Sequence, residues 1–273
     1  PPTDGRPTPT VTYYALPARD YAYGVLSEAD PRTAQPLGRL EDPRLPSSSS
    51  GLASARLGVY VITHRGVRSF ISRAAPGARV DLVETRGGRF SVSRDGVLAY
   101  TTDAVDATTE LYVLDPRVGP LPRRLTHLNP QLEGFPFAAP EVVTWTSFDG
   151  RRIEGLLFRP PGAEPGRRLP LVVMPHGGPS ALWSLGFYAD PHAPALYLAA
   201  RGFACLLPNP RGSLGYGEAF NALNRGDLGG GDLKDIEAGV DSLVNARVVD
   251  ARRVGLCGIS YGAYLAALAA SKS

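Results

Sequence analysis

The sequence predicts a chain in two parts, an all-β part over residues 1–138 followed by an α/β part over residues 139–273. Two patterns indicate this division. Before residue 138, short β-like stretches are separated by turn residues and show no helical periodicity. After residue 139, apolar runs alternate with segments whose apolar residues recur at helical spacing, which is typical of a parallel sheet with crossover helices.

In the first part, strands are predicted over residues 57–63, 89–93, 97–102 and 110–114. Turn signals such as Arg94-Asp95-Gly96 separate them at short spacing. The segment 36–51 contains several prolines and a run of four serines, so this composition favours a flexible loop.

The second part opens with a predicted antiparallel hairpin, residues 141–147 and 152–158, joined across Phe148-Asp149-Gly150. Buried strands are expected over 171–174, 203–207 and 253–257, where the chain is apolar. Helices are expected over 194–200, from Asp232 as the capping residue to Val244, and over 264–270. This alternation implies a parallel sheet with right-handed crossovers.

The composition argues against several classes of protein. The net charge of +3 comes from arginines spread along the chain, whereas a nucleic-acid site needs clustered charge. No apolar run is long enough to span a bilayer, so no membrane partner is expected. Cys205 and Cys257 lie inside apolar runs, which favours buried free thiols and a cytoplasmic location. The chain begins without Met or a signal-peptide pattern and is expected to be an excerpt.

The string Gly258-Ile259-Ser260-Tyr261-Gly262 stands between a predicted strand and a predicted helix. The string alone is weak in a chain this rich in glycine, but its context strengthens it. A nucleophile elbow needs a strand, an abrupt turn and a helix to hold a serine hydroxyl exposed in a strained conformation. Gly258 and Gly262 would prevent a collision where strand and helix approach each other. The alternative is a serine that merely caps an ordinary turn.

A second string, Pro175-His176-Gly177-Gly178-Pro179, follows the predicted strand 171–174. Its glycines would let a main-chain amide face a substrate carbonyl, and the amide of Tyr261 would supply a second donor. His176 is a tempting general base. Triads on such a sheet place the histidine after the serine in the chain, so a structural role for His176 is favoured.

The Gly-rich segment 208–217 matches neither the dinucleotide fingerprint nor the Walker loop, so no nucleotide cofactor is expected. Within it, Arg211 either contacts a substrate carbonyl or carboxylate, or braces the loop by bonding its carbonyls. His64, His127 and His192 show no metal-ligand spacing, and no metal is expected.

Four strings in this order resemble the prolyl oligopeptidase family of serine peptidases, closest to its acylaminoacyl-peptidase and dipeptidyl-peptidase-like branch. They are Thr146 to Gly150, His176 to Pro179, Asn209 to Gly217 and Gly258 to Gly262. The resemblance covers residues 140–273, while 110–114 and 124–129 resemble the last blade of the β-propeller that precedes the hydrolase domain in this family. It implies the N-terminal half of an α/β-hydrolase domain over 139–273, preceded by a partial β-propeller over 1–138.

The resemblance implies that Ser260 is the acylated nucleophile, with the backbone amides of Gly178 and Tyr261 forming the oxyanion hole. Gly258, Gly262, His176 and Gly177 would support the elbow and the loop. His176 stands where the dipeptidyl-peptidase branch places a tyrosine, which favours the acylaminoacyl branch. The implied partner is a short peptide substrate, without a cofactor.

One departure from the family is serious, because its triad Asp and His follow the nucleophile by many tens of residues. The sequence after Ser260 contains neither, so this chain alone is expected to have negligible hydrolytic activity. Two alternatives remain: a carboxylesterase or lipase on the same fold, and a non-catalytic binding protein that keeps the scaffold.

Overall fold

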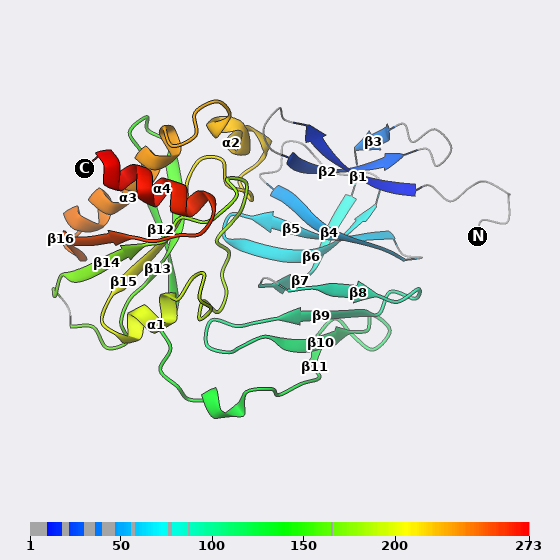
Figure 1. Ribbon diagram of the computed structural model, residues 1–273. Coiled ribbons are helices and arrows are strands. Elements are labelled where there is room, and N and C mark those ends of the chain that lie inside the picture. The colour runs from blue at the N-terminus through cyan, green and yellow to red at the C-terminus, as the bar shows by residue number, and fades with distance from the viewer. Residues whose placement is uncertain are drawn as a thin grey trace, which may run out of the picture.

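The computed structural model describes residues 10–17, 22–29, 36–39, 47–55, 58–75, 78–86, 88–164 and 166–272, with the backbone alone before residue 58 and at 74, 75 and 78. Figure 1 shows the sheets of the first part on the right and the α/β part, coloured green to red, on the left. The division that the sequence predicts near residue 138 falls between the last strand of the antiparallel sheets, which ends at Arg124, and the first strand of the α/β part, which begins at Pro140.

In the residues that the structure describes, the first part forms three sheets, and within each sheet strands that follow one another in the chain pair antiparallel. The first sheet contains β1 (Thr10–Pro17), β2 (Ala22–Ala29) and β3 (Pro36–Arg39). The second contains β4 (Ser47–Ala55), β5 (Gly58–Arg65), β6 (Arg68–Ala75) and β7 (Ala78–Thr85). The third contains β8 (Phe90–Val92), β9 (Leu98–Thr102), β10 (Glu110–Leu114) and β11 (Arg123–Arg124).

These strands confirm the four predicted in the described residues and correct one prediction. The loop expected over 36–51 is wrong at both ends, because β3 begins at Pro36 and β4 begins at Ser47. The serine run pairs with β5, from Ser47 opposite Arg65 to Ser50 opposite Ile62. Strand pairing therefore overrides the loop-like composition.

A buried glutamate holds the last two strands of the first part together. Glu110, only 4% exposed, accepts from Arg124 Nη2 at 2.8 Å and from the Leu128 amide at 2.9 Å. The Thr126 hydroxyl also donates to it. The two strings singled out in the sequence, 110–114 and 124–129, are thus joined by one charged group.

The second part is built on a mixed five-stranded sheet in the order β12-β13-β15-β14-β16. Its elements are β12 (Pro140–Thr146), β13 (Arg152–Phe158), β14 (Leu169–Val173), α1 (Ala195–Ala200), β15 (Ala204–Asn209), α2 (Glu218–Asn221), α3 (Gly231–Asn245), β16 (Val249–Leu256) and α4 (Tyr261–Lys272), with 3-10 turns η1 (Pro130–Leu132) and η2 (Ala222–Asn224). The predicted β12–β13 hairpin is confirmed, and β14 pairs parallel with both β15 and β16.

Alternate residues of the central strands supply two cores, one on each face of this sheet. On β15, Ala204 and Leu206 belong to the core that contains side chains of α3 and α4. Cys205 and Leu207 belong to the core that contains α1. The apolar run at 203–207 therefore forms a strand covered on both faces, as the sequence predicts.

Two expectations, one about the last strand and one about α3, are wrong. The strand predicted over 253–257 forms as β16, but it is largely exposed, because in the described residues it pairs only with β14. Cys257 is accordingly exposed, while Cys205 is buried and both are free thiols. Asp232 does not cap α3: the N-cap is Gly230, and the Asp227 carboxylate accepts from the Gly231 amide at 2.8 Å.

Backbone and side-chain hydrogen bonds join the two parts. The Val67 amide donates to Glu154 on β13 at 3.1 Å, and the Leu185 amide donates to the Val67 carbonyl at 2.7 Å. The Phe187 amide donates to Asp103 at 3.1 Å. The loop that follows β14 is therefore held between the first part and its own sheet.

Two further features are absent from the described residues. No helix there is long and apolar enough to cross a membrane. In the same residues no group of three or more His, Cys, Asp or Glu side chains is placed to hold a metal ion.

Candidate active site

Ser260 lies in the turn between β16 and α4, and its backbone has φ of 54°. A side-chain-bearing residue rarely adopts this left-handed region, so the turn is strained. Its surroundings hold it: the Gly262 amide donates to the Ile259 carbonyl at 2.9 Å, and the Tyr264 amide donates to the Ser260 carbonyl at 3.1 Å. Ser260 itself is exposed. This is the strand, abrupt turn and helix that the sequence predicts.

The glycines around Ser260 occupy places where no side chain fits. A Cβ added to Gly258 would lie 2.6 Å from the Gly262 carbonyl carbon. A Cβ added to Gly262 would lie 2.1 Å from the Pro175 carbonyl oxygen. Each glycine therefore permits a close backbone approach at this point.

The loop 175–179 lies directly beside the serine. A Cβ added to Gly177 would lie 3.5 Å from the Ser260 Cβ and 3.5 Å from the Ile259 carbonyl oxygen. Gly178 has φ of +120°, a conformation that favours glycine. Asn221 is only 2% exposed, and its side-chain amide donates to Ser180 Oγ at 3.0 Å and to the Gly212 carbonyl at 2.6 Å. These bonds connect the end of this loop to the Gly-rich segment.

His176 is buried within the same loop and bonds away from the serine. Its Nδ1 donates to the Gly177 carbonyl at 2.7 Å, and its Nε2 lies 2.9 Å from the oxygen of the Ser213 hydroxyl, which donates to the Pro210 carbonyl at 2.6 Å. Burial lowers the pKa of His176 to about 4, so the ring is neutral at pH 7. These contacts support the structural role favoured from the sequence.

The other three histidines of the chain also have partners away from Ser260. His64 Nδ1 bonds to the Ser69 hydroxyl at 2.8 Å. His127 bonds to Glu133 at 2.7 Å, and His192 lies 3.2 Å from Asp190.

Arg211 is engaged by carboxylates of its own chain. Its Nε and Nη2 donate to the two oxygens of Asp235 at 2.9 and 2.7 Å, while Nη1 lies 3.1 Å from Asp149. Its side chain is only 7% exposed and lies over the Phe148 ring at 4.7 Å. Of the two roles weighed from the sequence, this geometry favours the brace, with carboxylates as acceptors in place of the carbonyls expected. A substrate contact would require these ion pairs to break.

A further side-chain pair at the elbow escaped the sequence reasoning. The hydroxyl of Tyr261 donates to Asp232 on α3 at 2.5 Å. The sequence offered Asp232 only as a helix cap, because a spacing of 29 residues carries no local signal for such a contact.

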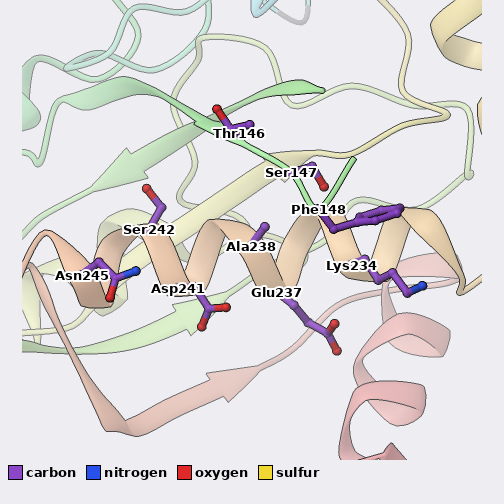
Figure 2. A pocket seen from close by; sticks show the side chains of 9 residues that line it. All are labelled: Thr146, Ser147, Phe148, Lys234, Glu237, Ala238, Asp241, Ser242 and Asn245. Carbon is purple, nitrogen blue, oxygen red and sulfur yellow. The ribbon is translucent and has the colours of Figure 1, made fainter. Parts of the chain in front are cut away.

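One pocket lined by described residues lies apart from Ser260. A pocket of about 550 Å³ lies between the β12–β13 turn and α3, and Figure 2 shows Phe148 lying across α3 near Lys234. Its lining residues are Thr146, Ser147, Phe148, Lys234, Glu237, Ala238, Asp241, Ser242 and Asn245. None of them is Ser260, Tyr261 or a member of the 175–179 loop.

An α/β sheet that presents an exposed, strained serine between a parallel strand and a helix defines a class, the α/β hydrolases with a nucleophile elbow. Residues 192–273 match the model of the prolyl oligopeptidase family. Over these residues the chain is similar to this family of serine peptidases, which agrees with the resemblance found in the sequence.

Two curated relatives illustrate the similarity. An uncharacterized peptidase of Bacillus subtilis, YuxL, is 33% identical over 162 residues, which is 59% of this chain and 24% of the relative. The acylamino-acid-releasing enzyme of Rattus norvegicus is 36% identical over 125 residues, which is 46% of this chain and 16% of that enzyme. The chain therefore spans a quarter or less of the length of these relatives.

Solved structures share the fold of nearly the whole chain. The uncomplexed acylaminoacyl peptidase of Pyrococcus horikoshii superposes with a TM-score of 0.80 at 22% identity, over 97% of this chain and 41% of that one. A puromycin-hydrolyzing peptidase of Mycobacterium tuberculosis gives 0.75 at 20% identity, over 98% and 43%. The β-sheets of the first part are thus included in the shared fold.

Proposed function

We propose that the protein containing this chain is a serine peptidase that hydrolyses short peptides through an acyl-enzyme on Ser260. The observation that carries the proposal is the exposed serine held at φ of 54° beside Gly177. A nucleophile in this position can reach a carbonyl bound against the loop 175–179. The match of residues 192–273 to the prolyl oligopeptidase family supports peptide bonds as the target.

In this reaction the Ser260 hydroxyl attacks the scissile carbonyl carbon while its proton passes to a general base. The carbonyl oxygen becomes an oxyanion that accepts hydrogen bonds from the backbone amides of Tyr261 and Gly178. The amine leaves with the proton, and water then hydrolyses the ester on Ser260. Since the described histidines all bond elsewhere, we place the base outside the described residues, and this chain alone stays predicted to have negligible activity.

The same proposal covers the domains. Residues 1–138 would be part of a β-propeller, and residues 139–273 the N-terminal half of an α/β-hydrolase domain. Two consecutive four-stranded antiparallel sheets, each formed by neighbouring strands in chain order, support the propeller, because blades have this form. A propeller would restrict access for folded proteins. The names of relatives, acylamino-acid-releasing enzyme and dipeptidyl-peptidase 5, also support short peptides as substrates.

Labelling by a fluorophosphonate tests the proposal in the natural protein that contains this sequence. The expected result is covalent labelling at Ser260 that the Ser260→Ala variant abolishes, with hydrolysis of peptide amides lost in parallel. A protein that turns over simple esters but no peptide amide would support the carboxylesterase alternative instead. A correctly folded protein that is not labelled would support the non-catalytic scaffold.

A further inference from the structure

The side chain that follows the nucleophile is anchored to the start of a different helix. Tyr261 is the first residue of α4, and its hydroxyl donates to Asp232 Oδ2 on α3 at 2.5 Å. The Gly229 amide in turn donates to the Tyr261 hydroxyl at 3.1 Å. The hydroxyl therefore both accepts and donates, and its position is fixed from two directions.

Burial of the Asp232 carboxylate at this point costs free energy. It is 1% exposed, and the donors that face it are neutral: the Tyr261 hydroxyl and the amides of Leu233 and Gly229. Burial and the nearby Asp227 raise the pKa of its carboxyl. A buried carboxylate held by neutral donors adds little to stability, so its contribution is better sought in the geometry that it imposes.

The segment before Asp232 also packs closely on the first turns of α4. A Cβ added to Gly229 would lie 2.8 Å from the Tyr264 hydroxyl and 2.3 Å from Leu268 Cδ2. The rings of Tyr261 and Tyr264 lie 5.5 Å apart on the same helix. The segment that leads into α3 therefore packs against the N-terminal half of α4, which begins directly after the strained residue Ser260.

We infer that Asp232 is a positioning residue for the nucleophile elbow. By accepting the hydrogen bond of the Tyr261 hydroxyl, Asp232 keeps the backbone amide of Tyr261 in a fixed direction. The inference rests on the proposed function, in which that amide donates to the oxyanion. A strained turn persists only when its surroundings over-determine it, and the Asp232–Tyr261 bond supplies one such constraint. Because the oxyanion forms only in the transition state, loosening the amide lowers kcat and leaves KM unchanged.

The test uses the natural protein with four variants. Tyr261→Phe removes the donor, Asp232→Ala removes the acceptor, and Asp232→Asn keeps an acceptor oxygen. Tyr264→Phe is the matched control, since it removes a hydroxyl that bonds the Leu228 carbonyl at 3.3 Å from the same helix. Rates are normalised to the protein that a fluorophosphonate titrates, so a misfolded fraction does not enter them.

We expect kcat to fall about 10-fold in Tyr261→Phe and in Asp232→Ala, with KM unchanged, because a displaced oxyanion donor costs less than the roughly 100- to 1,000-fold of a deleted one. A peptide aldehyde, which forms a tetrahedral adduct on the serine, should lose affinity by the same factor. Asp232→Asn should recover most of kcat, Tyr264→Phe should match the wild type, and the double variant should be no worse than either single change.

Unchanged kcat and aldehyde affinity in Tyr261→Phe would overturn the inference, as would a rise of KM alone. A wild-type protein that is neither labelled nor active would overturn the proposed function as well. The two failures are therefore distinguished by the wild-type measurement.

Discussion

Gly262→Ala tests whether the first turn of α4 must lie against the loop 175–179. The new Cβ would lie 2.1 Å from the Pro175 carbonyl oxygen and 3.1 Å from that of His176. Both contacts are with backbone atoms, so no side chain can rotate away. Because real Cβ contacts lie beyond 3.0 Å, the loop and the helix must separate by about 1 Å.

The size of the effect follows from this displacement. Overpacking of a well-packed contact costs about 1–3 kcal/mol of the free energy of unfolding. A misplacement of about 1 Å between the reacting groups can lower a rate about 100-fold. We therefore expect Gly262→Ala to lose about 2 kcal/mol of stability, and the fluorophosphonate labelling of Ser260 to slow about 100-fold.

The assay combines urea unfolding with the labelling rate in the natural protein that contains this sequence. Gly255→Ala on β16 is the matched control, because a Cβ added there meets nothing within 4 Å. It should leave both measurements near the wild type. If Gly262→Ala labels and unfolds like Gly255→Ala, the close approach of elbow and loop is not what the serine requires, and the reasoning fails.

Three further changes test the surroundings of the site. Arg211→Met leaves the fully buried Asp235 without its cation and should lower the free energy of unfolding by about 3–5 kcal/mol in urea titrations, whereas a loss under about 1 kcal/mol would contradict the brace. Burial raises the pKa of Asp103 from 3.8 to about 6. The contribution of its protonated form to the free energy of unfolding is therefore complete below pH 3.8 and is lost as the pH rises through 6. Relative to the wild type, the free energy of unfolding of Asp103→Asn should therefore rise by about 1–2 kcal/mol between pH 4 and pH 8, allowing for partial exposure. A difference between the two proteins that does not change with pH would refute this. Asp227→Ala removes the acceptor of the Gly231 amide and should cost about 1 kcal/mol by thermal or urea unfolding, while no loss would mean that Asp227 does not cap α3.

Much of the second part was predictable because its signals are local. The apolar run at 203–207, the turn Phe148-Asp149-Gly150 and the alanine-rich segment 264–270 each specify an element within a few residues. The glycines of the elbow were predictable for the same reason, since strand, turn and helix follow one another directly. The serine run at 47–50 was not, because its pairing with β5 is decided by a neighbouring strand and not by composition.

By itself, the sequence determined the change from an all-β to an α/β pattern, the resemblance to a family of serine peptidases, and Ser260 as the candidate nucleophile. Only the tertiary structure decided which polar groups meet: Arg211 with Asp235 across 24 residues, Tyr261 with Asp232 across 29, and Val67 with Glu154 across 87. Periodicity and motifs report the conformation of a short segment, whereas the partner of a buried charge depends on which distant segments the folded chain brings together.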